Sequence, residues 1–437
     1  MFRRTLFNSL LKKVSGTLPT TRNRALFPRS ESSRHLFQQA AKACLLAVCL
    51  LTTLTAQMVQ AQTVARCGQG WLEMIDGYAV LHLKGTHYEM GYQQGALLKE
   101  HVKQNLNYIV LEKGTQVLEF GPLKIKPREI IDGIVRGQKK YVPTKYHDEM
   151  AGLAAATGMP LKDVMAGNFL PELFHCSGFA VMNSATKDGT LYHGRVLDYA
   201  IDWKLQEHAV LVVAEPDGGI PFVNVTYAGF VGSVTGMNAK HVSIGEMGGS
   251  GLGHWQGVPM AFLVREVLET APDLDAAIAI FRDKPRTCQY FYVIADGKTN
   301  RAVGMEASWD TFSLIQPGQM HERLPDPVPD AVLLSAGDRY KELVKRAKAS
   351  HGQFAAESAL RLMDCPVAMK SNLHNALFEP KSTKLWVANA SADKKPAAEQ
   401  KYHAFQLSEL LKRKPDTAAP EMPLVAKVTV LVKPKQR

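Results

Sequence analysis

The pattern of hydrophobic and polar positions changes near residue 176. Before this point apolar residues recur at helical intervals, which predicts helices over residues 88–111, 130–141, 148–156 and 161–169. After it, short runs bounded by turn residues predict strands over residues 178–183, 190–199, 209–214, 222–226, 233–237, 241–245, 290–295, 302–306 and 385–389, with 425–432 as an edge strand. Helices are predicted in pairs, over residues 260–270, 274–281, 339–349 and 355–363. Antiparallel hairpins with paired helices indicate an α+β fold of stacked sheets with helices outside.

The N-terminal stretch predicts a leader for export. Nine basic residues precede an apolar run over residues 43–59, and Val59-Gln60-Ala61 suits signal peptidase. The uninterrupted apolar core, residues 43–54, is shorter than the about 20 residues that a membrane span needs, although an uncleaved anchor is the alternative. We therefore expect a signal peptide over residues 1–61 and an exported, periplasmic or secreted, mature chain with no stable membrane span.

The leader also explains the basic net charge. Residues 1–61 contribute +8 of the formal +11, which leaves +3 for the remainder of the 437-residue chain. The remainder has no basic stripe interleaved with aromatic residues, so nucleic acid is not an expected partner.

Four cysteines follow the leader: Cys67, Cys176, Cys288 and Cys365. Four are too few for a disulfide scaffold, and at most one internal bridge can form if Cys176 is a working thiol. The scattered histidines lack ligand spacing, and no CxxC or HExxH motif is present, so we expect neither a metal site nor a cofactor.

Cys176 opens a predicted hairpin that carries a cation and an anion. Residues 178–183 form its first strand, Lys187-Asp188-Gly189 its turn, and residues 190–199 its second strand. An antiparallel return brings Arg195 and Asp198 towards Cys176. Thiol, guanidinium and carboxylate would then share one end of a sheet. The alternative is a buried, inert cysteine beside an ordinary hairpin salt bridge.

The segment that ends in Gly194-Arg195-Val196-Leu197-Asp198 resembles the autoproteolytic cysteine acyltransferases and hydrolases related to isopenicillin N acyltransferase, which are N-terminal-nucleophile hydrolases. Three further segments resemble this family: LKGTHYEMGYQQG before the cysteine, and GMNAKHVSIGEMGG and SNLHNALFEPKSTKLWVANA after it. The resemblance implies a four-layer αββα sandwich. It also implies self-cleavage before Cys176, which would yield a helical pro-segment or small subunit over residues 62–175 and a nucleophile domain over residues 176–437, with a heterodimer of the two fragments as the expected product.

The resemblance implies further site residues. Arg339 stands where relatives carry a second arginine at the start of a helix, and Asn238 falls on the Gly-Met-Asn hairpin, where a turn role is the alternative. For the oxyanion site, Gln289 stands near the place of an asparagine of the relatives and can donate as an amide. Glu246 stands where some relatives have Asn or Tyr, so a backbone N–H is the alternative second donor.

The chemistry of an N-terminal cysteine explains why no histidine base is needed. A free thiol with a pKa of about 8.5 is only partly ionised near neutrality, and an adjacent α-amine with a pKa of about 7.7 to 8.0 can carry its proton. Arg195 would favour the thiolate, and Asp198 would accept a hydrogen bond from the α-ammonium or orient Arg195.

We expect an amidohydrolase or acyltransferase that acts on a small-molecule acyl amide through an acyl-enzyme on Cys176. The alternatives are a phospholipase-B-like or ceramidase-like lipid hydrolase of the same nucleophile class, and an exported binding protein that retains the fold without catalysis.

Overall fold

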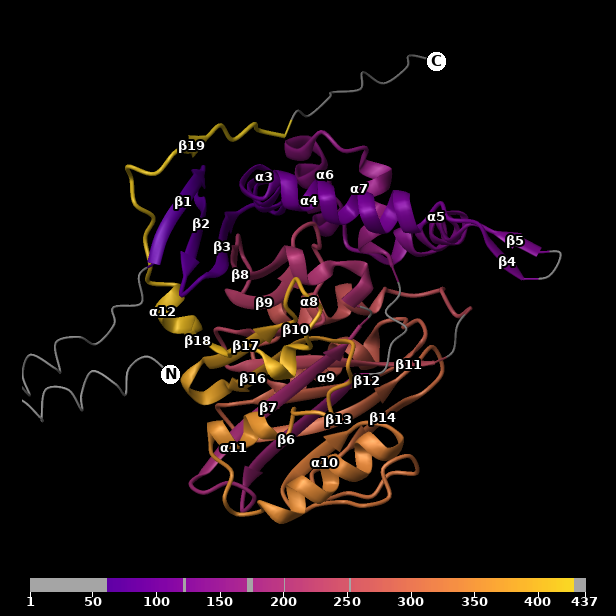
Figure 1. The fold of residues 1–437 in the computed structure, drawn as a ribbon, viewed down its shortest axis with the longest axis vertical. Helices are drawn as coiled ribbons and strands as arrows, with labels where there is room; N and C mark the ends of the chain where they lie inside the picture. The colour runs from indigo at the N-terminus through magenta and orange to yellow at the C-terminus, as the bar shows by residue number, and fades with distance from the viewer. Residues whose placement is uncertain (1–60, 121–122, 171–175, 200, 251–252, 428–437) are drawn as a thin grey trace, which may run out of the picture. The chain divides into compact units, whose positions relative to one another are not determined.

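Two stacked β-sheets form the centre of the protein (Figure 1). The structure is a computed structural model and describes residues 61–120, 123–170, 176–199, 201–250 and 253–427. The predicted leader therefore lies outside the described residues, apart from its last residue, and so does His175.

The larger sheet contains 11 of the described strands. In spatial order they are β14 (Phe312–Ile315), β13 (Arg301–Ala307), β12 (Gln289–Asp296), β11 (Val242–Ser250), β10 (Thr235–Asn238), β9 (Phe222–Tyr227), β8 (Ala209–Pro216), β3 (Tyr78–Gly85), β2 (Gly70–Ile75), β1 (Ala61–Cys67) and β19 (Glu421–Met422). Neighbouring strands are antiparallel except for the pairs β3–β8 and β1–β19. The β3–β8 pair joins strands from the two sides of residue 176 into one sheet.

The smaller sheet contains six of the described strands. They are β15 (Ala331–Leu334), β6 (Ser177–Asn183), β7 (Gly189–Asp198), β16 (Asn372–Glu379), β17 (Lys384–Asn389) and β18 (His403–Gln406). All its neighbouring pairs are antiparallel. Apolar side chains fill the space between the two sheets, with Phe179 and Val181 of the smaller sheet packed in one cluster with Val293 and Ala295 of the larger.

Helices cover the outer faces of both sheets. Helices α8 (Met260–Thr270) and α9 (Leu274–Asp283) pack on the larger sheet, since Phe262 of α8 and Phe281 of α9 share a buried cluster with Ile294. Helices α10 (Gly337–Ala349) and α11 (Ala356–Arg361) pack on the smaller sheet, where Leu343 and Ala359 lie in the cluster of Ala180. The order helix, sheet, sheet, helix confirms the predicted αββα sandwich.

The segment before Cys176 is a group of helices attached to the extension of the larger sheet. It comprises α3 (His87–Leu97), α4 (Lys99–Leu106), the π-helix η1 (Asn107–Lys113), the hairpin of β4 (Leu118–Phe120) and β5 (Leu123–Ile125), α5 (Pro127–Gln138), α6 (Thr144–Thr157) and α7 (Leu161–Asn168). A capping box of Thr86 and Glu89 starts α3. Helices α3 and α6 touch at glycines: a Cβ on Gly91 would lie 1.8 Å from the Glu149 carbonyl oxygen, and one on Gly152 would lie 2.0 Å from that of Tyr88. This contact gives a packing reason for the glycine of the Tyr-Glu-x-Gly motif.

Three sequence predictions need correction. The expected helix over residues 88–111 is broken at Leu98 and continues as α4 and η1. The segment 62–175 is not purely helical, because β1, β2 and β3 and the β4–β5 hairpin lie within or at the start of it. Residues 425–427 of the expected edge strand are not in a strand, and the rest of that range lies outside the described residues. The division at residues 175 and 176 remains a prediction.

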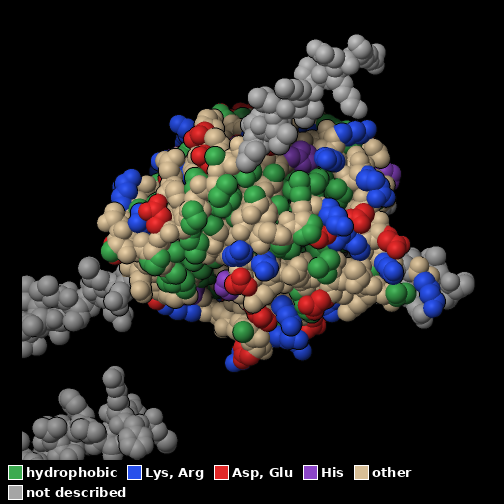
Figure 2. Space-filling view, turned by 90° about the horizontal axis from the view of Figure 1, so that it is seen from above, with side chains coloured by type: hydrophobic (Ala, Val, Ile, Leu, Met, Phe, Trp, Pro, Cys, Tyr) green, Lys and Arg blue, Asp and Glu red, His purple; other side chains and the backbone are tan. Residues whose placement is uncertain are grey.

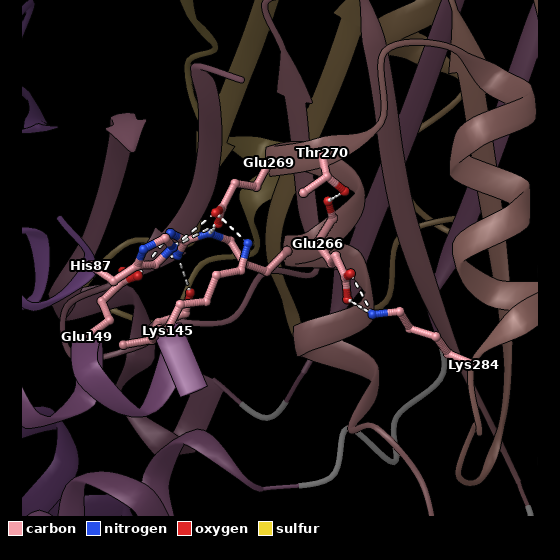
Figure 3. A network of polar contacts seen from close by, with 9 residues as sticks. His87, Lys145, Glu149, Glu266, Glu269, Thr270 and Lys284 are labelled. Atoms are coloured by element: carbon pink, nitrogen blue, oxygen red, sulfur yellow. Dashed lines mark hydrogen bonds and ion pairs between the residues drawn. The ribbon is translucent and has the colours of Figure 1, made fainter. Parts of the chain in front are cut away.

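A buried ionic network joins the helices before Cys176 to helix α8 after it (Figure 3). The Arg265 guanidinium makes two bonds to Glu149 of α6, at 3.1 and 3.0 Å. Glu269, one turn along α8, accepts from Lys145 at 2.6 Å and lies 3.0 Å from His87 of α3. The side chains of Arg265, Glu149 and Glu269 are all 2–3% exposed. These contacts bind the two predicted fragments to each other.

The face at the top of Figure 1 shows a wide hydrophobic area with basic and acidic side chains interspersed around it (Figure 2). No helix of the described residues is both long and apolar enough to cross a membrane.

Candidate active site

The β6–β7 hairpin puts Cys176 and Asp198 at the same end of the smaller sheet. Ser177 pairs with Val196 and Gly178 with Arg195, as the predicted antiparallel return requires. At the turn, Gly189 has a φ of +81°, which glycine adopts without strain. At position 194 glycine is required by packing, because a Cβ there would lie 2.1 Å from the Phe179 ring on the neighbouring strand. The Gly-Arg-x-x-Asp segment thus combines a packing glycine with two charged residues on the strand that pairs with the one following Cys176.

The buried Asp198 forms an ion pair with the partly buried Arg339, which also contacts Ser177, the residue after Cys176. The same Arg339 nitrogen donates to the Ser177 hydroxyl at 2.7 Å, and the Arg339 Nε donates to the Val367 carbonyl at 2.7 Å. The Met369 N–H donates to the other Asp198 oxygen at 2.9 Å. Burial raises the pKa of Asp198 to about 6, although the Arg339 charge and the Met369 N–H oppose this shift. The carboxyl group therefore titrates close to neutral pH.

Arg195 is fully buried and faces the larger sheet. Its Nε donates to the Glu246 carbonyl oxygen at 2.9 Å, and a terminal nitrogen lies 3.3 Å from the Glu246 carboxylate. Gly245 makes room for this side chain, because a Cβ there would lie 2.6 Å from the Arg195 Cγ. Burial and then the Arg195 charge lower the pKa of the neighbouring His193 to about 3, so this imidazole is neutral at physiological pH.

A cavity of about 390 Å³ contains Cys176 in its wall. Cys176 itself is buried, with 5% of its surface exposed. The cavity walls come from the end of β11, from β12 and from the segments on both sides of β15, and they comprise Cys176, Met247, Gly248, Gly249, Ser250, Phe291, Arg323, Leu324, Leu334, Ser335, Ala336 and Gly337. The Ser335 hydroxyl lies 2.7 Å from that of Ser177, which links the cavity to the Arg339 contacts. A buried thiol with an adjoining space of this size can meet a small-molecule substrate.

A second pocket, of about 100 Å³, lies beside Tyr199, the residue after Asp198. Its walls are mainly apolar and include Ile109, Leu170 and Phe230. Residues from both sides of Cys176 therefore contribute to it, and it offers an environment suited to an aliphatic or aromatic group.

The structure separates the three residues predicted for the oxyanion site. Asn238 is the last residue of β10 and holds the turn into β11, since its side chain bonds the Ala271 carbonyl oxygen and the N–H groups of Lys240 and Val242. Glu246 provides a counter-charge to Arg195. Gln289 donates to Glu306 and accepts from Ser250, which lines the cavity. Gln289 is thus coupled through Ser250 to the cavity wall.

Two polar residues near Asp198 were not identified from the sequence. Ser177 accepts the Arg339 bond, and Asn372 is a hydrogen-bond partner of Asp198 that also donates to the Leu197 carbonyl at 3.1 Å. Asn372 starts β16 within the SNLHNALFEP segment, so the motif indicated its strand but not its contact. A contact between residues so far apart in sequence has no local signal.

The other thiols lie in environments that disfavour ionisation. Burial raises the pKa of Cys67 and of Cys288 to about 11, and burial also raises the pKa of Cys365. None of these three is in a disulfide. Within the described ranges, no group of three or more His, Cys, Asp and Glu side chains is arranged to hold a metal ion.

Comparison with known proteins gives a consistent relationship. Residues 184–318 match the family described as acyl-coenzyme A:6-aminopenicillanic acid acyl-transferase. Protein dcd1A of Dictyostelium discoideum is 29% identical over 261 residues, which are 53% of this chain and 58% of dcd1A. The N-acylethanolamine-hydrolyzing acid amidase of Cavia porcellus is 25% identical over 180 residues, 39% of this chain and 50% of the amidase. The chain therefore spans little more than half of the length of these relatives.

Among solved structures, the Caenorhabditis elegans ortholog of that amidase aligns with a TM-score of 0.39 and 18% identity, over 47% of this chain and 93% of the ortholog. The matched family segment contains Arg195 and Asp198 and begins eight residues after Cys176. The predicted resemblance is confirmed: residues 184–318 are similar to the acyl-coenzyme A:6-aminopenicillanic acid acyl-transferase family, and part of the chain is similar to the acid amidases.

Proposed function

We propose that this protein is an exported, self-processing amidohydrolase or acyltransferase that acts on amide-linked acyl groups through Cys176. The observation that carries the proposal is the position of Cys176, in the wall of a cavity and one residue before Ser177, which bonds Arg339 of the Asp198–Arg339 ion pair. Its relationship to named acyltransferases and amidases supports the same reaction class.

Self-processing creates the catalytic N-terminus. The Cys176 sulfur attacks the carbonyl carbon of residue 175, the peptide C–N bond breaks, and the acyl group moves to sulfur as a thioester. Water then hydrolyses the thioester, which leaves a carboxylate on residue 175 and an α-amine on Cys176. The amine lies within one residue of the thiol and replaces the histidine base of other cysteine enzymes.

In turnover the α-amine takes the thiol proton, and the thiolate attacks the amide carbon of the substrate. The C–N bond of the tetrahedral intermediate breaks, the leaving amine takes a proton from the α-ammonium, and an acyl thioester remains on Cys176. Water or an acceptor amine then displaces the thiolate and gives up its proton to the α-amine. Ionised Asp198 holds the α-ammonium, and Arg339 holds Asp198 in place.

The acyl group is proposed to be aliphatic or aromatic. The apolar side chains of Met247, Phe291, Leu324 and Leu334 in the wall of the Cys176 cavity support this assignment, which is also compatible with the ceramidase-like alternative, in which the amide belongs to a lipid. The proposed enzyme and the ceramidase-like alternative use the same kind of nucleophile and differ only in the substrate.

Hydrolysis of a panel of aminocoumarin amides with short, aromatic and long acyl groups tests the proposal. We expect the wild type to turn over at least one amide and Cys176→Ala to turn over none. Cys288→Ala is the matched control, because Cys288 is equally buried but has a raised pKa, and it should retain activity. If folded Cys176→Ala hydrolyses an amide, or if only Cys288→Ala loses the activity, then Cys176 is not the catalytic cysteine. Folded wild-type protein whose Cys176 stays uncleaved and unreactive towards iodoacetamide would favour the binding-protein alternative.

A further inference from the structure

The cavity that contains Cys176 has one cationic side chain in its wall. Among the described residues that line it, Arg323 is the only Lys, Arg, Asp or Glu, and the other lining residues are apolar or neutral. Arg323 is exposed, so its charge remains hydrated and is not costly to the fold.

A tight turn fixes the backbone of Arg323. The Leu324 N–H donates to the His321 carbonyl oxygen at 2.9 Å, and the His321 N–H donates to the Leu324 carbonyl oxygen at 3.3 Å. The Arg323 N–H donates to the Nδ1 atom of His321 at 3.3 Å, and His321 in turn lies 3.3 Å from Glu306 of β13. Leu324 is buried in the cavity wall. The turn is thus anchored both to the wall and to the larger sheet.

The Arg323 side chain lies over an aromatic ring of the same cavity. The guanidinium carbon is 5.7 Å from the centre of the Phe291 ring, and Phe291 lines the cavity on β12. A cation above an aromatic ring is attracted weakly to the face of the ring. The N–H groups around the edge of the guanidinium remain available to a hydrogen-bond acceptor. Packing against Phe291 therefore limits where Arg323 can present its donors.

The nearby acid does not neutralise Arg323. Glu306 bonds Gln289 and His321, and the ion pairs within the described residues do not include Arg323. The positive charge at this wall is available to a bound anion, whereas the positive charges of Arg195 and Arg339 are balanced by Glu246 and Asp198.

We propose that Arg323 selects substrates that carry a carboxylate close to the scissile amide. The inference rests on the proposed function, because it concerns the substrate of the Cys176 reaction. A planar guanidinium binds a carboxylate through two parallel hydrogen bonds, which a neutral hydroxyl cannot match. The carboxylate can belong to the amine part, as in an N-acyl amino acid, or to the acyl part, as in a monoamide of a dicarboxylic acid.

Steady-state hydrolysis of two matched pairs of amides tests the proposal and distinguishes these sources. The first pair is N-decanoylglycine and N-decanoylethanolamine, and the second is the glutaryl and pentanoyl amides of aminocoumarin. We expect the wild type to prefer the carboxylated member of at least one pair. Arg323→Gln should lower kcat/KM for that member by roughly tenfold to hundredfold, the range of one charge-assisted contact, and should leave the neutral member unchanged. Arg323→Lys should restore part of the preference, and a higher ionic strength should weaken it.

Arg301→Gln is the matched control, since Arg301 is an exposed arginine on β13 that does not line the cavity. Equal kcat/KM for the wild type and Arg323→Gln on all four amides, or equal losses on charged and neutral amides, would overturn the role of Arg323 and leave the proposed function intact. A processed wild type that hydrolyses none of these amides or of the wider panel would overturn both.

Discussion

Two ionic clusters in this protein each hold a buried carboxylate, and the pKa of that carboxylate is shifted in opposite directions. In one, Arg265 and Glu269 of α8 meet Glu149, Lys145 and His87 of the preceding helices (Figure 3). In the other, Asp198 pairs with Arg339, which contacts the residue after Cys176. Both contain a buried carboxylate next to an arginine. Their pKa shifts have opposite directions, and this difference indicates which cluster is structural.

In the Arg265 cluster the charges dominate over burial. Burial alone would raise the pKa of Glu269, but the hydrogen bond from His87 and the charges of Arg265 and His87 lower it to about 2. The Arg265 guanidinium also packs 4.7 Å from the Phe222 ring centre and 5.4 Å from that of Tyr146. A carboxylate held ionised at every physiological pH is suited to binding helices together.

Beside Cys176 burial dominates instead. It raises the pKa of Asp198 to about 6, so this carboxyl group can change its charge near neutral pH. A carboxyl group whose pKa is shifted towards neutral pH, and which lies near a thiol and a cavity, is characteristic of catalytic sites. The comparison therefore supports an assembly role for the Arg265 cluster and the catalytic role that we propose for Asp198.

Removing Arg265 should have the largest effect on stability. Arg265→Ala leaves two buried carboxylates without their shared cation, and we expect the free energy of unfolding to fall by about 3–5 kcal/mol. The rate at which iodoacetamide labels Cys176 in the remaining folded protein should not change. Arg195→Ala is the contrasting variant, because it should slow this labelling, and Arg195→Lys should restore part of the rate. The comparison fails if Arg265→Ala slows labelling as much as Arg195→Ala does.

The Arg265 cluster should also make stability sensitive to acid. The folded-state pKa of Glu269 is about 2, below its ordinary value of 4.5, so its contribution is fully present above pH 4.5 and is lost as the pH falls towards 2. This contribution is on the order of 3 kcal/mol at pH 7. Urea unfolding of the wild type and Glu269→Gln should therefore differ at pH 7 and converge near pH 2. A difference that does not depend on pH would contradict the assignment.

Filling the space at Gly245 should displace Arg195 and lower the free energy of unfolding by less than the changes at Arg265 and Glu269. The added methyl group of Gly245→Ala would overlap the Arg195 Cγ atom, and overpacking of this kind costs about 1–3 kcal/mol. We expect slower labelling of Cys176 as well, since Arg195 must move. Gly133→Ala is the control, because a Cβ there meets its nearest neighbour only at 3.7 Å. Normal labelling in Gly245→Ala would show that the placement of Arg195 does not matter for the thiol.

The raised pKa of Asp198 predicts an acid limb in the activity. Folded protein retains the Asp198 proton up to a pH of about 6, so kcat/KM should fall about tenfold for each pH unit below this value. Glu269→Gln should keep the same limb, because Glu269 belongs to the other cluster. Activity that stays constant down to pH 4 would remove Asp198 from the mechanism.

The sequence predicted local structure better than long-range contacts. The β6–β7 hairpin follows from the Asp188-Gly189 turn, and its register brings Asp198 next to Cys176 as expected. The Asp76-Gly77 turn between β2 and β3 carries a similar signal that the helical interpretation of this region missed. By contrast, Arg265 and Glu149 are 116 residues apart, and no local pattern connects them.

The predicted site residues also divide into those whose positions followed from the sequence and those whose contacts did not. Cys176, Asp198 and Arg339 lie together, whereas Asn238, expected near the site, holds the turn from β10 into β11. Glu246, at a position expected to contribute to the oxyanion site, has its side chain bonded to Arg195 across the two sheets. The motifs identify which residues are unusual, while their partners depend on how the sheets stack.

Intact-mass analysis of the purified protein, with N-terminal sequencing, tests the central role of Cys176 most directly. The account predicts two chains: a 262-residue fragment that begins CSGFAV, and a partner of about 114 residues that runs from near Gln62 to His175. Cys176→Ala should give one uncleaved chain, which controls for cleavage by other proteases. A single full-length chain in wild-type protein that hydrolyses amides would contradict the account, because the proposed α-amine could not then exist.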